Sequence, residues 1–168
     1  MIILSATTVF ASGIGFVKAY DKIADETREE INVGTEGDIK DQKAKYRMYD
    51  KTRIKKCMIK NERLKENDGK PFTWKIKPKE RIETKEGHLK KGTCVQVAAC
   101  MGFEEEHPET HIAIGIIDED GEETYIENGV NLVSHLKVKK DGRYRVFLEN
   151  LGAKKAIAGG HYMVCMCG

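Results

Sequence analysis

The sequence predicts an all-β protein whose main domain is an antiparallel, jelly-roll-like β-sandwich. From Phe72 onward, apolar and polar residues alternate with a period of two, which gives each strand one dry face and one wet face. Glycine-bearing turns separate these runs at short intervals, as is typical of sandwiches and barrels. No βαβ alternation follows Lys70, so no parallel sheet is expected there.

The first predicted strands follow this alternation closely. Residues 72–76 alternate between apolar and polar side chains until Pro78 stops the run. A second alternating run covers residues 95–99, after a turn at Gly92. The segment His111–Ile117 is almost continuously apolar, with isoleucines on one side, and is expected to be a buried strand.

Three turns fold the second half of this region back on itself. Asp118–Gly121 predicts a hairpin turn with glycine where a positive φ is needed, and it is followed by a returning strand. Asn128-Gly129 and Asp141-Gly142 turn the chain again. Residues 144–148 alternate once more, and residues 156–167 supply the last one or two strands.

The chain divides into three predicted segments. Residues 1–11 are interpreted as the remnant of a signal peptide, residues 12–70 as a charged N-terminal extension, and residues 71–168 as the sandwich domain. The first segment is apolar and ends in Val9-Phe10-Ala11, a small-residue pattern that signal peptidases cut; the alternative is a buried N-terminal strand or helix. Lys18 interrupts the apolar run before it reaches roughly 20 residues, so a membrane-spanning helix is not expected. We therefore expect a secreted protein, extracellular or in the cell envelope.

The extension contains two distinct parts. Apolar residues in the segment 12–30 recur near the 3.6-residue period, which is compatible with a short amphipathic helix or with a solvated extension. The segment Lys43–Lys65, here called the basic segment, has many cations interleaved with apolar residues. It is a candidate contact surface for an anionic partner, and the alternative is a solvated face. The candidate binding residues are Lys51, Arg53, Lys55 and Lys56.

The charge balance limits the choice of partner. The chain has 29 basic and 27 acidic side chains, for a net charge of +2. It therefore lacks the global basic excess that draws proteins to nucleic acid, and no nucleic-acid partner is expected. The partner itself is unknown, and the candidates are an anionic cell-envelope polymer or a protein.

Three short motifs carry a resemblance to a known class of module. They are Leu-x-Lys-Gly-x-x-Val-x-Val at 89–97, Ile-Gly-Ile-Ile-Asp-Glu-Asp-Gly at 114–121 and Gly-x-Tyr-x-Val-x-x-x-Asn at 142–150. With the apolar last strand, this pattern resembles the small jelly-roll β-sandwich modules of exported proteins in Gram-positive bacteria, similar to bacterial pre-peptidase C-terminal domains. The resemblance covers about residues 72–167. It implies a secreted accessory module that has no catalytic residues of its own, and it names no ligand.

One turn has a partial resemblance to a calcium loop. Counted from Ile116, the residues Asp118, Asp120 and Glu127 occupy positions 3, 5 and 12, with Gly121 at position 6. Position 1 is the isoleucine, which offers no oxygen ligand. A plain hairpin turn is therefore the alternative to a metal site.

A second acidic segment is the basis for an alternative function. The loop 104–111 holds four glutamates and two histidines, side chains that can hold a divalent cation. Its spacing is not that of a zinc-protease helix, and the chain has no Gly-x-Ser-x-Gly nucleophile elbow. The loop is either a solvated connection or the centre of a small metal-dependent or hydrolytic enzyme.

The cysteines suggest a disulfide without fixing its pairing. Five are present, and none has the Cys-x-x-Cys spacing of zinc knuckles and redox motifs. A disulfide between the strand at 94–100 and the last strand is possible if these strands are neighbours, and small buried side chains or a metal site are the alternatives. The disulfide candidates are Cys94, Cys100, Cys165 and Cys167.

Together these observations favour a non-enzymatic, secreted or cell-envelope binding or accessory module of unknown ligand. No cofactor is expected. The first alternative is the small enzyme that would use the loop 104–111. The second is a structural or assembly protein that acts through its N-terminal extension.

Overall fold

The computed structural model describes residues 41–65, 69–102, 111–127 and 131–166. The predicted leader, residues 1–11, and the predicted helical segment, residues 12–30, lie outside these ranges. The described residues contain eleven β-strands and one 3₁₀ turn, η2 (Lys51–Arg53), and the predicted all-β class is confirmed. In these ranges, no helix is long and apolar enough to cross a membrane.

The larger sheet has seven strands and is mostly antiparallel. Its strand order is β1-β8-β7-β10-β4-β2, and β5 also pairs with β10. The strands are β1 (Lys45–Met48), β2 (Lys56–Arg63), β4 (Glu80–Lys85), β5 (Gly87–Leu89), β7 (Ile112–Asp118), β8 (Glu122–Glu127) and β10 (Gly142–Asn150).

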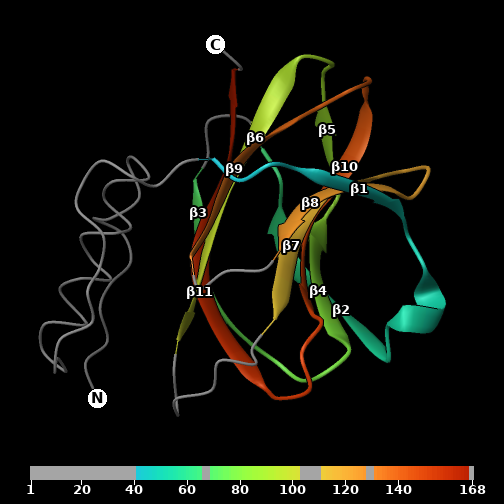
Figure 1. The fold of residues 1–168 in the computed structure, drawn as a ribbon. Coiled ribbons are helices and arrows are strands. Elements are labelled where there is room, and N and C mark those ends of the chain that lie inside the picture. The colour runs from blue at the N-terminus through green and yellow to red at the C-terminus, as the bar shows by residue number, and fades with distance from the viewer. Residues whose placement is uncertain (1–40, 66–68, 103–110, 128–130, 167–168) are drawn as a thin grey trace, which may run out of the picture. The chain divides into compact units, whose positions relative to one another are not determined.

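The smaller sheet has four strands and is entirely antiparallel. Its order is β3-β11-β6-β9, so β11 lies between β3 and β6. The strands are β3 (Lys70–Ile76), β6 (Thr93–Gly102), β9 (Asn131–Lys137) and β11 (Ala156–Met166). The two sheets face each other and form the sandwich, as Figure 1 shows.

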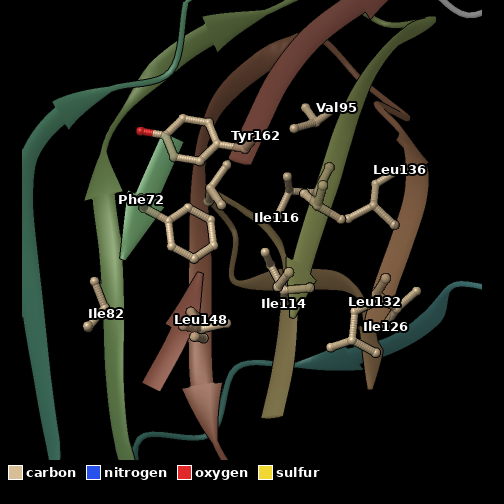
Figure 2. Packing of buried hydrophobic residues seen from close by; sticks show 14 of the residues in the cluster. Phe72, Ile82, Val95, Ile114, Ile116, Ile126, Leu132, Leu136, Leu148 and Tyr162 are labelled. Atoms are coloured by element: carbon tan, nitrogen blue, oxygen red, sulfur yellow. The ribbon is translucent and has the colours of Figure 1, made fainter. Parts of the chain in front are cut away.

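The core lies between the two sheets, where alternate residues of each strand point inward. These side chains form one apolar cluster, and most of them are fully buried. Figure 2 shows members from both sheets facing each other: Phe72, Val95, Leu132, Leu136 and Tyr162 from one sheet and Ile82, Ile114, Ile116, Ile126 and Leu148 from the other. The burial of these side chains is the main force that holds the two sheets together.

Two predicted features are confirmed in detail. The residues of β3 alternate between buried and exposed from Phe72 to Ile76, as the pattern required. The hairpin at Asp118–Gly121 joins β7 to β8, and Gly121 has a φ of +85°. Because that φ is strained for any residue with a Cβ, glycine is the suitable residue at this position.

The sandwich also includes strands from the predicted extension, where residues 53–60 of the basic segment favoured a strand or an irregular edge over a helix. β1 and β2 belong to the seven-stranded sheet, although residues 12–70 read as an extension before the domain. β2 is parallel to β4, which is the one parallel pair among the described strands. β4 itself is rich in charge, and its Arg81 and Glu83 are buried on the face that points away from the core.

Candidate functional site

A groove of about 600 Å³ lies on the outer face of the seven-stranded sheet. It is formed by the edge strand β2, the neighbouring β4, and the short β5 where it pairs with β10. Its lining residues are Ile59, Arg63, Thr84, Lys85, Glu86, Gly87, His88, Arg143 and Arg145. We call this feature the cationic groove, because four of these residues are lysine or arginine and one is acidic.

The parallel pairing of β2 with β4 places two cations side by side. After an irregularity in the pairing that follows Ile59, Arg63 lies directly opposite Lys85. Both side chains are exposed, and neither forms an ion pair with any described carboxylate. Like charges directly opposite each other on neighbouring strands destabilise a sheet. This pair is therefore an unbalanced concentration of positive charge.

The other two arginines of the groove are partly neutralised. Arg143 contacts Glu86 at 3.4 Å and Glu119 at 3.1 Å, but it is 61% exposed. Arg145 is less exposed and contacts Glu83 at 2.7 Å. The fixed carboxylates hold these two guanidinium groups at the groove wall, while Arg63 and Lys85 supply the uncompensated charge.

A network of buried ion pairs lies beside the groove on the same face. We call it the Arg81 cluster; it consists of the arginines Arg47, Arg53, Arg81 and Arg145 and the glutamates Glu83, Glu123 and Glu149. At its centre, Arg81 is fully buried. Its Nε lies 2.6 Å from Glu83, and its Nη1 lies 2.6 Å from Glu123 and 3.2 Å from Glu149.

Aromatic rings complete this cluster. The guanidinium of Arg81 lies 3.8 Å from the ring centre of Phe147, and that of Arg47 lies 4.2 Å from the ring centre of Tyr125. Both are cation–π contacts, which are strongest where water is excluded. Hydrogen bonding to Glu123 and the charge of Glu149 raise the pKa of Arg47, although burial alone would lower it. The ion pairs of Arg47 and Arg53 therefore hold the segment from β1 to η2 against the outer face of the sheet.

This cluster changes the interpretation of the basic segment. Arg53 was predicted to bind an external anion, but its Nε lies 3.1 Å from Glu149 and its charge is used inside the molecule. Arg47, in the same segment, is used in the same way. Lys51, Lys55 and Lys56 are exposed, but they do not line the groove.

The three residues of the predicted calcium loop serve other purposes. Asp118 Oδ1 accepts hydrogen bonds from the backbone N–H groups of Asp120 and Glu122, which closes the hairpin turn. Lys140 forms ion pairs with both Asp118 and Asp120. Glu127 lies at the far end of β8, where it contacts Lys45 at 2.6 Å. The structure therefore does not bring the three carboxylates together.

The acidic loop is mostly beyond what the structure describes. Of the residues 104–111, only His111 falls within the described ranges, and its Nε2 lies 3.4 Å from Glu127. Elsewhere in the described part of the chain, no group of three or more histidine, cysteine, aspartate or glutamate residues is arranged to hold a metal ion.

The cysteines differ in state. Cys94 is disulfide-bonded, whereas Cys100 and Cys165 are free thiols; Cys167 lies outside the described residues. Cys165 faces Cys94 across the β6–β11 pair. Cys57, on β2, is a free thiol at the surface. Partial burial of this thiol, together with the charge of Glu83, raises its pKa to about 11.

Of the groove residues, Arg63 belongs to the basic segment but was not among its candidate binding residues, and Lys85, His88 and Arg143 were not singled out from the sequence. They come from four different strands, and only the parallel β2–β4 register brings the first two together. One signal was available: Lys85, His88 and Arg143 are cations or imidazoles on short segments that flank turns. That signal does not distinguish a groove from an ordinary solvated surface.

Comparisons with known proteins identify no family for this chain. No protein-family model matches it, and no curated protein matches it. Among solved structures, the chain is similar to PliG of Aeromonas hydrophila, a periplasmic lysozyme inhibitor of g-type lysozyme. That match has 9% sequence identity and a TM-score of 0.36, and it covers 64% of this chain and 98% of the other.

Proposed function

We propose that this protein is a non-enzymatic, exported binding module that holds an anionic ligand in the cationic groove. The observation that supports this most is the position of Arg63 directly opposite Lys85, with no described carboxylate to balance either. An anionic group between them would replace a repulsive contact by two charge-assisted hydrogen bonds, which are among the stronger hydrogen bonds in proteins.

The rest of the groove suits an extended anionic ligand better than a single ion. Arg143 and Arg145 continue the positive surface from β4 toward β10, and His88 lies at the same end. Ile59, which is 55% exposed, supplies an apolar contact at the opposite strand. A ligand with several negative charges and an apolar portion would meet both kinds of surface.

One of the described cysteines, Cys94, supports export as part of this proposal, although Cys57, Cys100 and Cys165 are free thiols. Cys94 is disulfide-bonded, and disulfides form and persist mainly in oxidising compartments. The apolar segment 1–11, interpreted as the remnant of a leader, is consistent with the same route. On these grounds, the proposal includes a location outside the cell or in the envelope. The exported Gram-positive modules that the motifs resemble have the same kind of location.

The test is a binding measurement with charge-reversed variants. Labelled poly-L-glutamate and linear polyphosphate would be titrated with the full chain in low salt, and the bound fraction followed by fluorescence anisotropy. We expect R63E and K85E each to weaken binding by about tenfold or more, because each removes a charged hydrogen-bond donor. High salt should weaken binding of the wild type as well, since the groove is open to solvent.

A matched control separates the groove from general charge. Lys75 is an exposed lysine on β3, in the other sheet, so K75E changes the net charge by the same amount at a distant place. It should change the affinity by less than about twofold. Equal losses in K75E and K85E, or no binding of either polyanion to the wild type, would refute the proposed function.

A further inference from the structure

The strand β2 leaves one edge of the seven-stranded sheet open. It pairs with β4 alone, so in the described part of the chain its other side has no partner strand. Alternate residues of such a strand direct their backbone N–H and C=O groups away from the sheet, where they can pair with an added strand. At eight residues, β2 is long enough to do so.

The other sheet edges are less suitable for an added strand. β1 has only four residues. β3 contains Pro71, which has no N–H to donate. The edge at β9 already receives a hydrogen bond, from the N–H of Gln42 to the carbonyl of Val133. β2 has none of these obstacles, and it forms one wall of the cationic groove.

The charges of β2 indicate what kind of strand it would accept. Lys56, Lys60 and Arg63 make the strand basic, and its acidic residue, Glu62, accepts a hydrogen bond from Tyr162 at 3.1 Å. A second copy of β2 would bring like charges together, so these residues oppose self-association. An acidic strand would instead be attracted to them.

We propose that the ligand of the cationic groove is an acidic, extended polypeptide segment that adds to β2 as a further strand. This inference rests on the proposed function and specifies its ligand. The added strand would form backbone hydrogen bonds with β2 and continue the sheet beyond its present edge. Its side chains on the outer face would then lie over the groove.

The groove also predicts the pattern of that segment. Because side chains alternate along a strand, every second residue of the added strand faces the groove. The residue beside Ile59 should be apolar, since that side chain is exposed and has no charge. In a segment that runs parallel to β2, the facing residues that follow should be acidic, since they meet Arg63 and Lys85. The residues between them are directed to the other face and are not selected by the groove.

The experiment uses a capped heptapeptide, acetyl-Thr-Val-Thr-Glu-Thr-Glu-Thr-amide, and two N-methylated versions of it. One version carries N-methyl groups on the four threonines, and the other carries them on the valine and both glutamates. In a paired strand, one of these sets of N–H groups points toward β2 and the other points to solvent. Strand addition therefore predicts that one version loses at least tenfold in affinity while the other binds like the unmodified peptide.

The outcomes distinguish this inference from the proposed function. If both N-methylated peptides bind as well as the parent, or if polyphosphate binds the groove but no peptide does, strand addition is wrong and the anion-binding function stands. If none of the peptides or polyanions binds, the proposed function itself fails. Binding of the parent peptide should also fall at least fivefold in R63E and remain within twofold in K75E; equal affinity in both variants would contradict the inference.

Discussion

The Nη1 atom of Arg81 on β4 lies 2.6 Å from the Oε1 atom of Glu123 on β8, and neither side chain is accessible to solvent. These strands are separated in the sheet by β7 and β10. The pair therefore spans the outer face over two intervening strands, and Arg47 closes over it from β1. Because every member is paired, the cluster avoids the penalty of a buried, uncompensated charge.

Removal of the central cation should be strongly destabilising. In R81M the glutamates Glu83, Glu123 and Glu149 keep their charges but lose the arginine that contacts all three. Breaking a buried ion pair on one side typically costs about 3–5 kcal/mol, and we expect a loss of that size in the free energy of unfolding, measured with urea at pH 7.

A surface ion pair provides the comparison for this variant. Lys45 contacts Glu127 at 2.6 Å, but the lysine is 47% exposed. K45M should therefore lower the free energy of unfolding far less than R81M does, because solvent screens an exposed ion pair. Similar losses for K45M and R81M would show that the cluster is no stronger than an ordinary surface pair.

The adjacent glycines of β11 should respond very differently to alanine. A Cβ added at Gly160 would collide with the carbonyl oxygen of Ala98 and would lie 2.8 Å from the ring of Phe72. A Cβ added at Gly159 meets nothing closer than the carbonyl oxygen of Phe72, at 3.9 Å. We expect G160A to lose about 1–3 kcal/mol or to fail to fold, because overpacking forces the strands apart.

The neighbouring G159A variant is the matched control. Its thermal midpoint should fall within a few degrees of the wild type, since the site has ordinary contact distances and the backbone φ is not positive. Thermal unfolding followed by circular dichroism would measure both variants. Equal midpoints for G159A and G160A would contradict the close approach of β11 to β6.

Cys57 should react slowly with alkylating agents in spite of its exposed position. With a pKa of about 11, about one thiol in a thousand is ionised at pH 8, against about one in four for an ordinary cysteine. Alkylation by iodoacetamide, followed by peptide mapping, should therefore be about two orders of magnitude slower than in the unfolded chain. A titration midpoint below pH 9 in the folded protein would contradict this environment.

The same pKa shift affects stability at high pH, and its sign follows from linkage. The unfolded chain releases the Cys57 proton near the ordinary thiol pKa, whereas the folded chain holds it until about pH 11. The contribution of this group is therefore complete below the unfolded pKa and is lost as the pH rises between these two values. Denaturation midpoints measured at pH 8 and pH 10 should show the decrease, and the variant C57A should show less of it.

The cysteines should fall into two groups by their reactivity with an alkylating agent when the protein is unfolded without reductant. Cys57, Cys100 and Cys165 are free and should all take up iodoacetamide in guanidinium chloride. Cys94 is disulfide-bonded and should be labelled only after reduction. Labelling of Cys94 before reduction, read out by mass spectrometry of the peptides, would rule out this disulfide.

The strands that bury one face in the core were readily predicted from the sequence. Residues 72–76 and the hairpin at 118–121 follow from alternation and turn chemistry, because both signals are local. β4 was missed, because the outer positions of a sandwich strand are assumed to be wet. Arg81 and Glu83 are instead buried there by partners from distant parts of the chain.

The candidate site was less accessible to sequence reasoning. Ten cations in the segment 43–65 suggested one basic surface, but Arg47 and Arg53 turn inward to pair with Glu149. Arg63 and Lys85 become neighbours only through the register of a parallel pair, which no local pattern encodes. Because these two residues lie on separate segments of the chain, the groove could not be predicted from the sequence.

The central position of β11 has a consequence for how the chain folds. β6 can pair with β9, but β3 is not joined to them until residues 156–166 form β11 between β3 and β6. The ladders therefore close loops of many tens of residues, and chains with such distant pairings reach the native state slowly. A nascent chain that ends before residue 156 therefore lacks the strand that joins β3 to β6, and it cannot complete the smaller sheet.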